Sequence, residues 1–103
     1  MSETAVITVI KTKPIKSTTS VSGTLILCSN DEWYSILISR PSRNPWFIRG
    51  LPSNRNGKSD MNIGSEIFSL RCKGSVEPEV EVGIEMLLQA LNGEKVAHDK
   101  ISY

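Results

Sequence analysis

Residues 23–39 read GTLILCSNDEWYSILIS, and this stretch decides the fold. Two apolar runs, 23–29 and 33–39, flank the polar segment 30–32. Asn and Asp suit the tight positions of a turn, and runs rich in Ile, Leu, Trp and Tyr are typical of strands. The stretch therefore predicts a β-hairpin, which further strands extend on both sides.

These further strands are predicted from short apolar or β-branched runs bounded by turn residues. They comprise residues 5–11, 46–51 and 66–72. Residues 12–22 contain Pro14 among many Ser and Thr, which favours a connection or an irregular edge strand. Residues 52–65 contain Asn56-Gly57 and little that is apolar, so we expect a long turn or loop there.

A helix is predicted after the last strand. Pro78 suits a first helical turn, and Asn92-Gly93 is a typical stop. At 100° per residue, one apolar stripe follows the helix and should cover the sheet. The stripe consists of Val80, Ile84, Leu87, Leu88 and Leu91. The expected fold class is thus α+β, a small and mainly antiparallel sheet of about four or five strands packed by one C-terminal helix.

Length and composition favour one small globular domain over residues 1–103, with 94–103 as a tail. The hydrophobic content of 39% and the charged content of 22% are ordinary for such a domain. The net charge is only +1, but residues 1–75 carry ten Lys and Arg against five acids, whereas residues 76–103 carry two against six. A basic sheet region and an acidic helix therefore either steer partners of opposite sign or simply keep the monomer soluble.

No segment of the sequence indicates export, membrane insertion or catalysis. The N-terminus lacks the charged and apolar regions of a signal peptide, and no apolar run is long enough to span a bilayer. Cys28, Cys72 and His98 have no metal-ligand spacing, and no nucleophile motif is present. We therefore expect a soluble cytoplasmic protein that has no membrane contact, no cofactor, no metal and no enzymatic activity.

The predicted helix carries a second apolar face. Val82 and Met86 point away from the stripe, beside the small residues Gly83 and Ala90. Exposing two such side chains forgoes roughly 1.5–3 kcal/mol each, so something should cover them. Either the long loop or the N-terminal strand covers this face within the monomer, or the face is an interface for a second copy or another protein.

Residues 40–58, RPSRNPWFIRGLPSNRNGK, contain no acid. Their candidate binding residues are Arg40, Arg43, Trp46, Phe47, Arg49, Arg55 and Lys58. Arginine neutralises phosphates and exposed aromatic rings stack on unpaired bases, so the segment suits single-stranded nucleic acid. Alternatively, the aromatic residues lie in the core, or the Arg and Trp pair with a protein partner.

The sequence favours a small non-enzymatic binding protein of the inhibitor, immunity or adaptor type. It would act through protein–protein contacts and could form a homodimer. The expected interface residues are Val82, Met86 and Ala90 on the helix and Arg43, Trp46 and Arg49 in the basic segment. The alternative is a single-stranded nucleic-acid-binding protein that uses the residues of 40–58.

Overall fold

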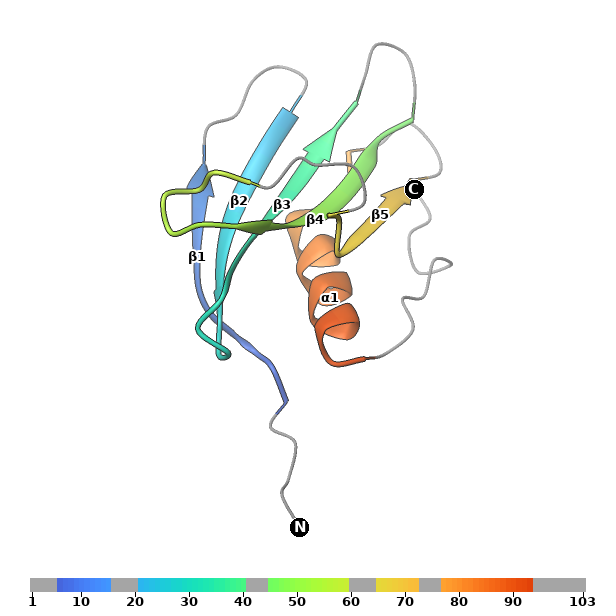
Figure 1. The fold of residues 1–103 in the computed structure, drawn as a ribbon. Coiled ribbons are helices and arrows are strands. Elements are labelled where there is room, and N and C mark those ends of the chain that lie inside the picture. The colour runs from blue at the N-terminus through green and yellow to red at the C-terminus, as the bar shows by residue number, and fades with distance from the viewer. Residues whose placement is uncertain (1–5, 16–20, 41–44, 60–64, 73–76, 94–103) are drawn as a thin grey trace.

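The computed structural model describes residues 6–15, 21–40, 45–59, 65–72 and 77–93, and it contains one antiparallel sheet and one helix (Figure 1). The elements are β1 (Val9–Ile15), β2 (Val21–Cys28), β3 (Trp33–Ser39), β4 (Phe47–Ser53), β5 (Phe68–Arg71) and α1 (Val80–Leu91). The predicted α+β class, a small antiparallel sheet with one C-terminal helix, is confirmed.

The strands follow one another in the sheet in chain order, from β1 to β5. β2 and β3 form the predicted central hairpin, in which Leu27 is the partner of Trp33 next to the turn and Val21 is the partner of Ser39 at the far end. Within the turn, the Asp31 N–H donates to the carbonyl of Cys28 at 3.0 Å. Asp31 has a φ of 63°, a left-handed conformation that Asp tolerates better than most residues.

Two strands continue through a proline at which the prediction ended or excluded them, while β2 and β5 differ from their predicted bounds by one or two residues at each end. β1 covers Val9–Ile15 rather than 5–11, and it includes Pro14. Among the described strands β1 lies at the edge of the sheet, where a missing N–H can face outward. β4 likewise continues through Pro52, which is paired with Tyr34 of β3. The pairing of β4 with β5 ends at Gly50, so Pro52 has no partner strand on that side among the described strands.

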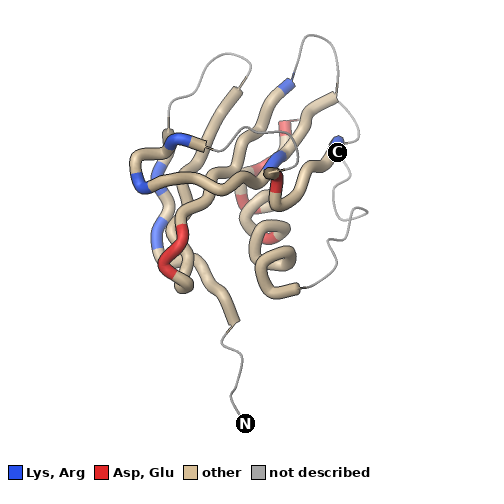
Figure 2. The backbone as a smooth tube through the Cα atoms, viewed as in Figure 1, with Lys and Arg blue, Asp and Glu red and all other residues tan. Residues whose placement is uncertain are grey.

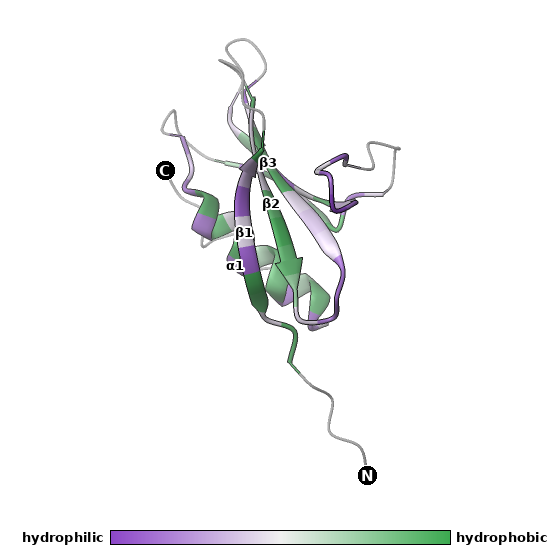
Figure 3. Cartoon of the chain, turned by 90° about the vertical axis from the view of Figure 1, so that its left-hand side faces the viewer, coloured by the Kyte–Doolittle hydropathy of each residue, from purple (hydrophilic) through white to green (hydrophobic). Residues whose placement is uncertain are grey.

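Side chains alternate between the two faces of the sheet, and α1 covers one of them. Figure 3 shows α1 on one side of the sheet and the segment after β4 on the other. The helix-side core contains Ile26, Tyr34, Ile36, Ile38, Ile48, Phe68, Leu70, Met86 and Leu87. This face is therefore closed by the helix, and we call the opposite face the helix-free face.

The helix is rotated by about a quarter turn from the predicted orientation. Met86 is 2% exposed and Leu87 is fully buried, whereas Ile84 and Leu88 are only half-buried. Gly83 lies at the centre of the contact, because a Cβ on it would come within 2.6 Å of Ile36 Cγ2. The prediction that Met86 faces away from the sheet is wrong, since the missing side chain at Gly83 lets the helix approach closely on that side.

The end of α1 is fixed to the chain before β1. The Asn92 Oδ1 accepts a hydrogen bond from the Ile7 N–H at 2.8 Å, and its Nδ2 donates to the carbonyls of Ile7 at 3.1 Å and Leu88 at 2.8 Å. Gly93 follows with a φ of 77°. The predicted stop at Asn92-Gly93 is confirmed, and its asparagine also anchors the N-terminal segment.

Candidate functional site: a basic cluster on the helix-free face

Residues 53–59 form a tight hairpin that we call the strap. The Gly57 N–H donates to the Asn54 carbonyl at 3.0 Å, and Asn54 Oδ1 accepts from the N–H groups of Asn56 and Lys58 at 2.9 and 3.0 Å. Gly57 has a φ of 86°, as expected for the last residue of a three-residue hairpin loop. Within the segment 52–65, for which a long turn or loop was predicted, residues 53–59 thus form a hairpin. Residues 60–64 lie outside the described residues.

The strap crosses the helix-free face toward β1 (Figure 1). Near its base, Ser59 Oγ shares a hydrogen bond with Ser35 Oγ, and Ser35 is fully buried. Near its tip, a Cβ on Gly57 would lie 2.9 Å from Ile15 Cγ2. These contacts hold the strap against β3 and the end of β1.

Docking of the strap brings together four cations from distant parts of the sequence. Lys11 and Lys13 alternate with Thr12 in β1, so both side chains lie on the helix-free face, and both are exposed. Arg55 and Lys58 are exposed on the strap. Figure 2 shows the basic segments of β1 and the strap at the same edge of the sheet. We call Lys11, Lys13, Arg55 and Lys58 the basic cluster.

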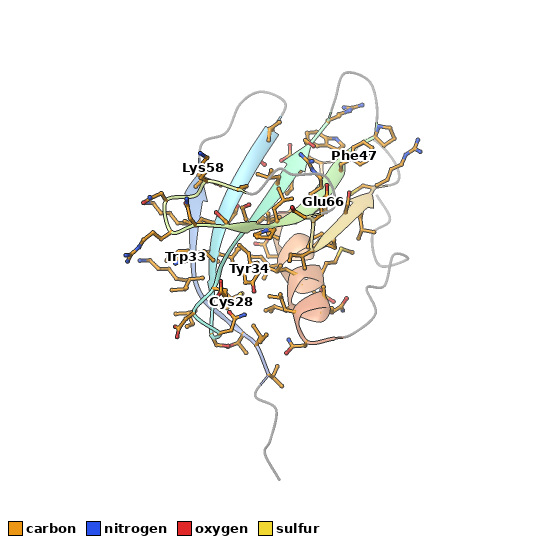
Figure 4. All side chains as sticks on the ribbon, viewed as in Figure 1. Cys28, Trp33, Tyr34, Phe47, Lys58 and Glu66 are labelled. Carbon is orange, nitrogen blue, oxygen red and sulfur yellow. The ribbon has the colours of Figure 1, made fainter. Side chains whose placement is uncertain are left out.

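The cluster is available to an external anion. Within the described ranges, none of its four side chains is engaged in an ion pair. Acidic Asp31 and Glu32, both exposed in the β2–β3 turn, bound the cluster at one end (Figure 2). Glu66 precedes β5 and lies next to β4, because the Ile67 N–H donates to the Gly50 carbonyl at 2.7 Å (Figure 4). The remaining described acids belong to α1 or directly precede it, and they are Glu77, Glu79, Glu81 and Glu85.

The predicted basic segment 40–58 is divided between the two faces of the sheet. Arg40 lies over the Trp46 ring at 5.7 Å from its centroid, and Trp46 packs against the helix-side core. Phe47 and Arg49 point to the helix-free face, where the Cα partner of Phe47 is Arg71. Arg43 lies outside the described residues. The structure therefore does not bring Trp46 and Phe47 into one aromatic surface.

The predicted helix interface also changes. Met86 lies in the helix-side core and offers no surface to a partner, while Val82 and Ala90 are half-buried. The second apolar face was expected either to be buried within the monomer or to be an interface. Met86 is buried within the monomer. The cover is the sheet itself rather than the long loop or the N-terminal strand.

The sequence analysis did not include Lys11 and Lys13 among the candidate binding residues. The sequence feature that could have indicated them is the alternation of side chains along a strand, which places Lys11 and Lys13 on the same face of β1. Their proximity to Arg55 and Lys58 depends on the docked strap, which no local pattern indicates.

The two cysteines are packing residues. Both are buried, and burial raises the pKa of the Cys28 and Cys72 thiols above the ordinary value of 9.0. At neutral pH they are therefore protonated and poorly nucleophilic. In the described part of the chain, no three His, Cys, Asp or Glu side chains are grouped as a metal site requires.

Searches against protein-family models, curated proteins and solved structures found no match for this chain. The helix that the structure describes lacks the length and apolar composition to cross a membrane. We therefore infer function from the charges and contacts of the described residues.

Proposed function

We propose that this chain is a small nucleic-acid-binding protein that holds a strand by its phosphates at the basic cluster. The observation that carries this proposal is the segregation of charge: the basic cluster lies on the helix-free face, and the acids of α1 lie beyond the sheet. Arg49 and Arg71 extend the same face toward β5. A single strand can follow such a face because its backbone is flexible.

The low net charge of +1 is compatible with this proposal. Exposed charges more than about 8 Å apart are largely screened at physiological salt. A phosphate at the strap therefore interacts mainly with the basic cluster and only weakly with the glutamates beyond the sheet. Each phosphate that a Lys or Arg neutralises releases condensed counterions, which favours binding most at low salt.

The proposal is tested by titrating a labelled single-stranded oligonucleotide and measuring fluorescence anisotropy. For single strands, the logarithm of the association constant falls by about 0.7 per phosphate contact for each tenfold rise in salt concentration. At about 0.1 M salt, losing two contacts therefore weakens binding about 25-fold. We expect this loss for the R55Q/K58Q variant. These side chains are exposed, so the fold should be unaffected.

The matched control removes two charges from the helix instead. The E81Q/E85Q variant should bind as tightly as the wild type or slightly more tightly, although it changes the net charge by two units, as R55Q/K58Q does in the opposite direction. If the wild type does not bind at low salt, or if R55Q/K58Q binds as the wild type does, the proposal is wrong.

Protein–protein contact through α1, including a homodimer, is a second candidate function. The observation that favours it is the flank formed by Ile84, Leu88 and Leu91, three large apolar side chains that are half-buried. Val82, also half-buried, lies on the other flank, whereas Ala90 falls between Met86 and Gly83 on the arc that faces the sheet. Complementary packing against a partner would remove this apolar area from water.

This second candidate is tested by light scattering after size exclusion. We expect a dimer for the wild type and a monomer for Leu88→Glu, because a charge at Leu88 would be buried in the interface. Leu88 is the suitable position, since a charge at the buried Met86 would disrupt the core. A monomeric wild type at high concentration would exclude the homodimer.

A further inference from the structure

We propose that Trp33 stacks on an unpaired base of the strand that the basic cluster holds, and that the ligand is therefore single-stranded. This inference rests on the proposed function. It adds a residue that lies outside the basic segment of the sequence and is placed beside the cluster only by the sheet and the strap.

The register of the sheet places Trp33 and the cluster in one row. Across the strands, Lys11 is the partner of Leu27, Leu27 of Trp33, and Trp33 of Ser53. All four side chains of this row lie on the helix-free face. Ser53 is also the base of the strap, because it forms a bridge to Ser59. Trp33 thus lies between the strand that carries Lys11 and the strap that carries Lys58.

The surroundings of Trp33 differ from those of the other aromatic residues. Trp33 is half-buried and lies outside the helix-side core, on the side of the sheet that carries the strap (Figure 4). Tyr34 is 8% exposed in that core, and its hydroxyl accepts a hydrogen bond from Asn30 Nδ2 at 3.0 Å. Trp46 packs against the same core under Arg40. Of these three rings, only Trp33 combines partial exposure with a place beside the cluster.

The charges around Trp33 orient a bound strand. Asp31 and Glu32, at the adjacent turn, repel phosphates, while Lys11 and the strap cations attract them. The backbone is therefore directed toward the strap, which leaves an adjacent base free to reach the indole. A base within a duplex is already stacked on its neighbours and cannot do so.

The experiment uses the two tryptophans of the chain as reporters. In the Trp46→Phe variant, all tryptophan emission comes from Trp33, and a single-stranded oligonucleotide should quench it. The Trp33→Leu variant keeps an apolar side chain but lacks the ring. Its single-strand affinity should fall about fivefold or more, because aromatic stacking contributes at least this factor per base.

Two controls make the result specific. Phe47→Leu removes a ring from the same face at the opposite end of β4 (Figure 4), and its affinity should stay unchanged. Inorganic polyphosphate, which has no bases, should bind Trp33→Leu and wild type equally. Circular dichroism melting verifies that each variant is folded.

The outcomes separate the two proposals. Single-strand binding by the wild type, without Trp33 quenching and with unchanged affinity in Trp33→Leu, would overturn the stacking role and leave the phosphate-binding function intact. Equal affinity for duplex and single strand would also overturn it. Absence of binding to every oligonucleotide and to polyphosphate would instead overturn the proposed function.

Discussion

We expect Gly83→Leu to destabilise the fold by about 3 kcal/mol or more, because Gly83 is buried between the helix and the sheet. A Cβ alone on Gly83 would lie 2.6 Å from Ile36 Cγ2 and 3.1 Å from Ile48 Cγ2. A leucine there must push the helix from the sheet, which opens the packing around Met86 and Leu87. Leucine has the higher helix propensity by about 1 kcal/mol, but this gain is smaller than the packing loss.

The matched control is Glu85→Leu, which introduces the same side chain on the exposed side of α1. Its unfolding free energy should stay within about 0.5 kcal/mol of the wild type. Chemical denaturation monitored by circular dichroism gives both values. If Gly83→Leu were as stable as Glu85→Leu, the helix would not pack on the sheet through Gly83, and the orientation predicted from the apolar stripe would be favoured.

The sequence predicted the elements that depend on local patterns. Polar residues 30–32 between two apolar runs indicated the central hairpin, and Asn92-Gly93 indicated the end of the helix. Both signals are local, because a turn conformation and a helix stop depend on the few residues that form them. The α+β class followed from the order of these elements.

The rotation of the helix could not be predicted in the same way. Apolar residues occupy much of the circumference of α1, so periodicity alone allowed several orientations. The choice depends on Gly83, whose missing side chain fits against Ile36 and Ile48 of two different strands. A glycine carries no hydrophobic signal, and its contribution appears only when both surfaces are present.

The division of the basic segment was accessible from the sequence but was overlooked. Adjacent residues of an extended segment point to opposite faces, so Trp46, directly before β4, and Phe47, its first residue, cannot share one surface. The basic cluster could not be predicted, because β1 and the strap come to the same edge of the sheet only when the strap folds back toward Ile15. Local composition therefore indicated a basic surface, but it did not indicate which basic residues the fold places on one face.

We expect the variant K11Q/K13Q/R55Q/K58Q to lose nearly all affinity for single-stranded nucleic acid. Each phosphate contact contributes about 0.7 to the slope of the logarithm of affinity against the logarithm of salt concentration. At about 0.1 M salt, removing four contacts therefore weakens binding about 600-fold. All four side chains are exposed, so the variant should unfold at the same denaturant concentration as the wild type. Anisotropy titration and a denaturation curve provide the two measurements.

The salt dependence of binding tests the central claim most directly. The logarithm of the association constant is plotted against the logarithm of salt concentration for the wild type and for the four-residue variant. If the basic cluster holds the phosphates, the slope of the wild type is steeper by about 2.8. Equal slopes, or a wild-type affinity that does not change with salt, would contradict a phosphate-binding role for the basic cluster.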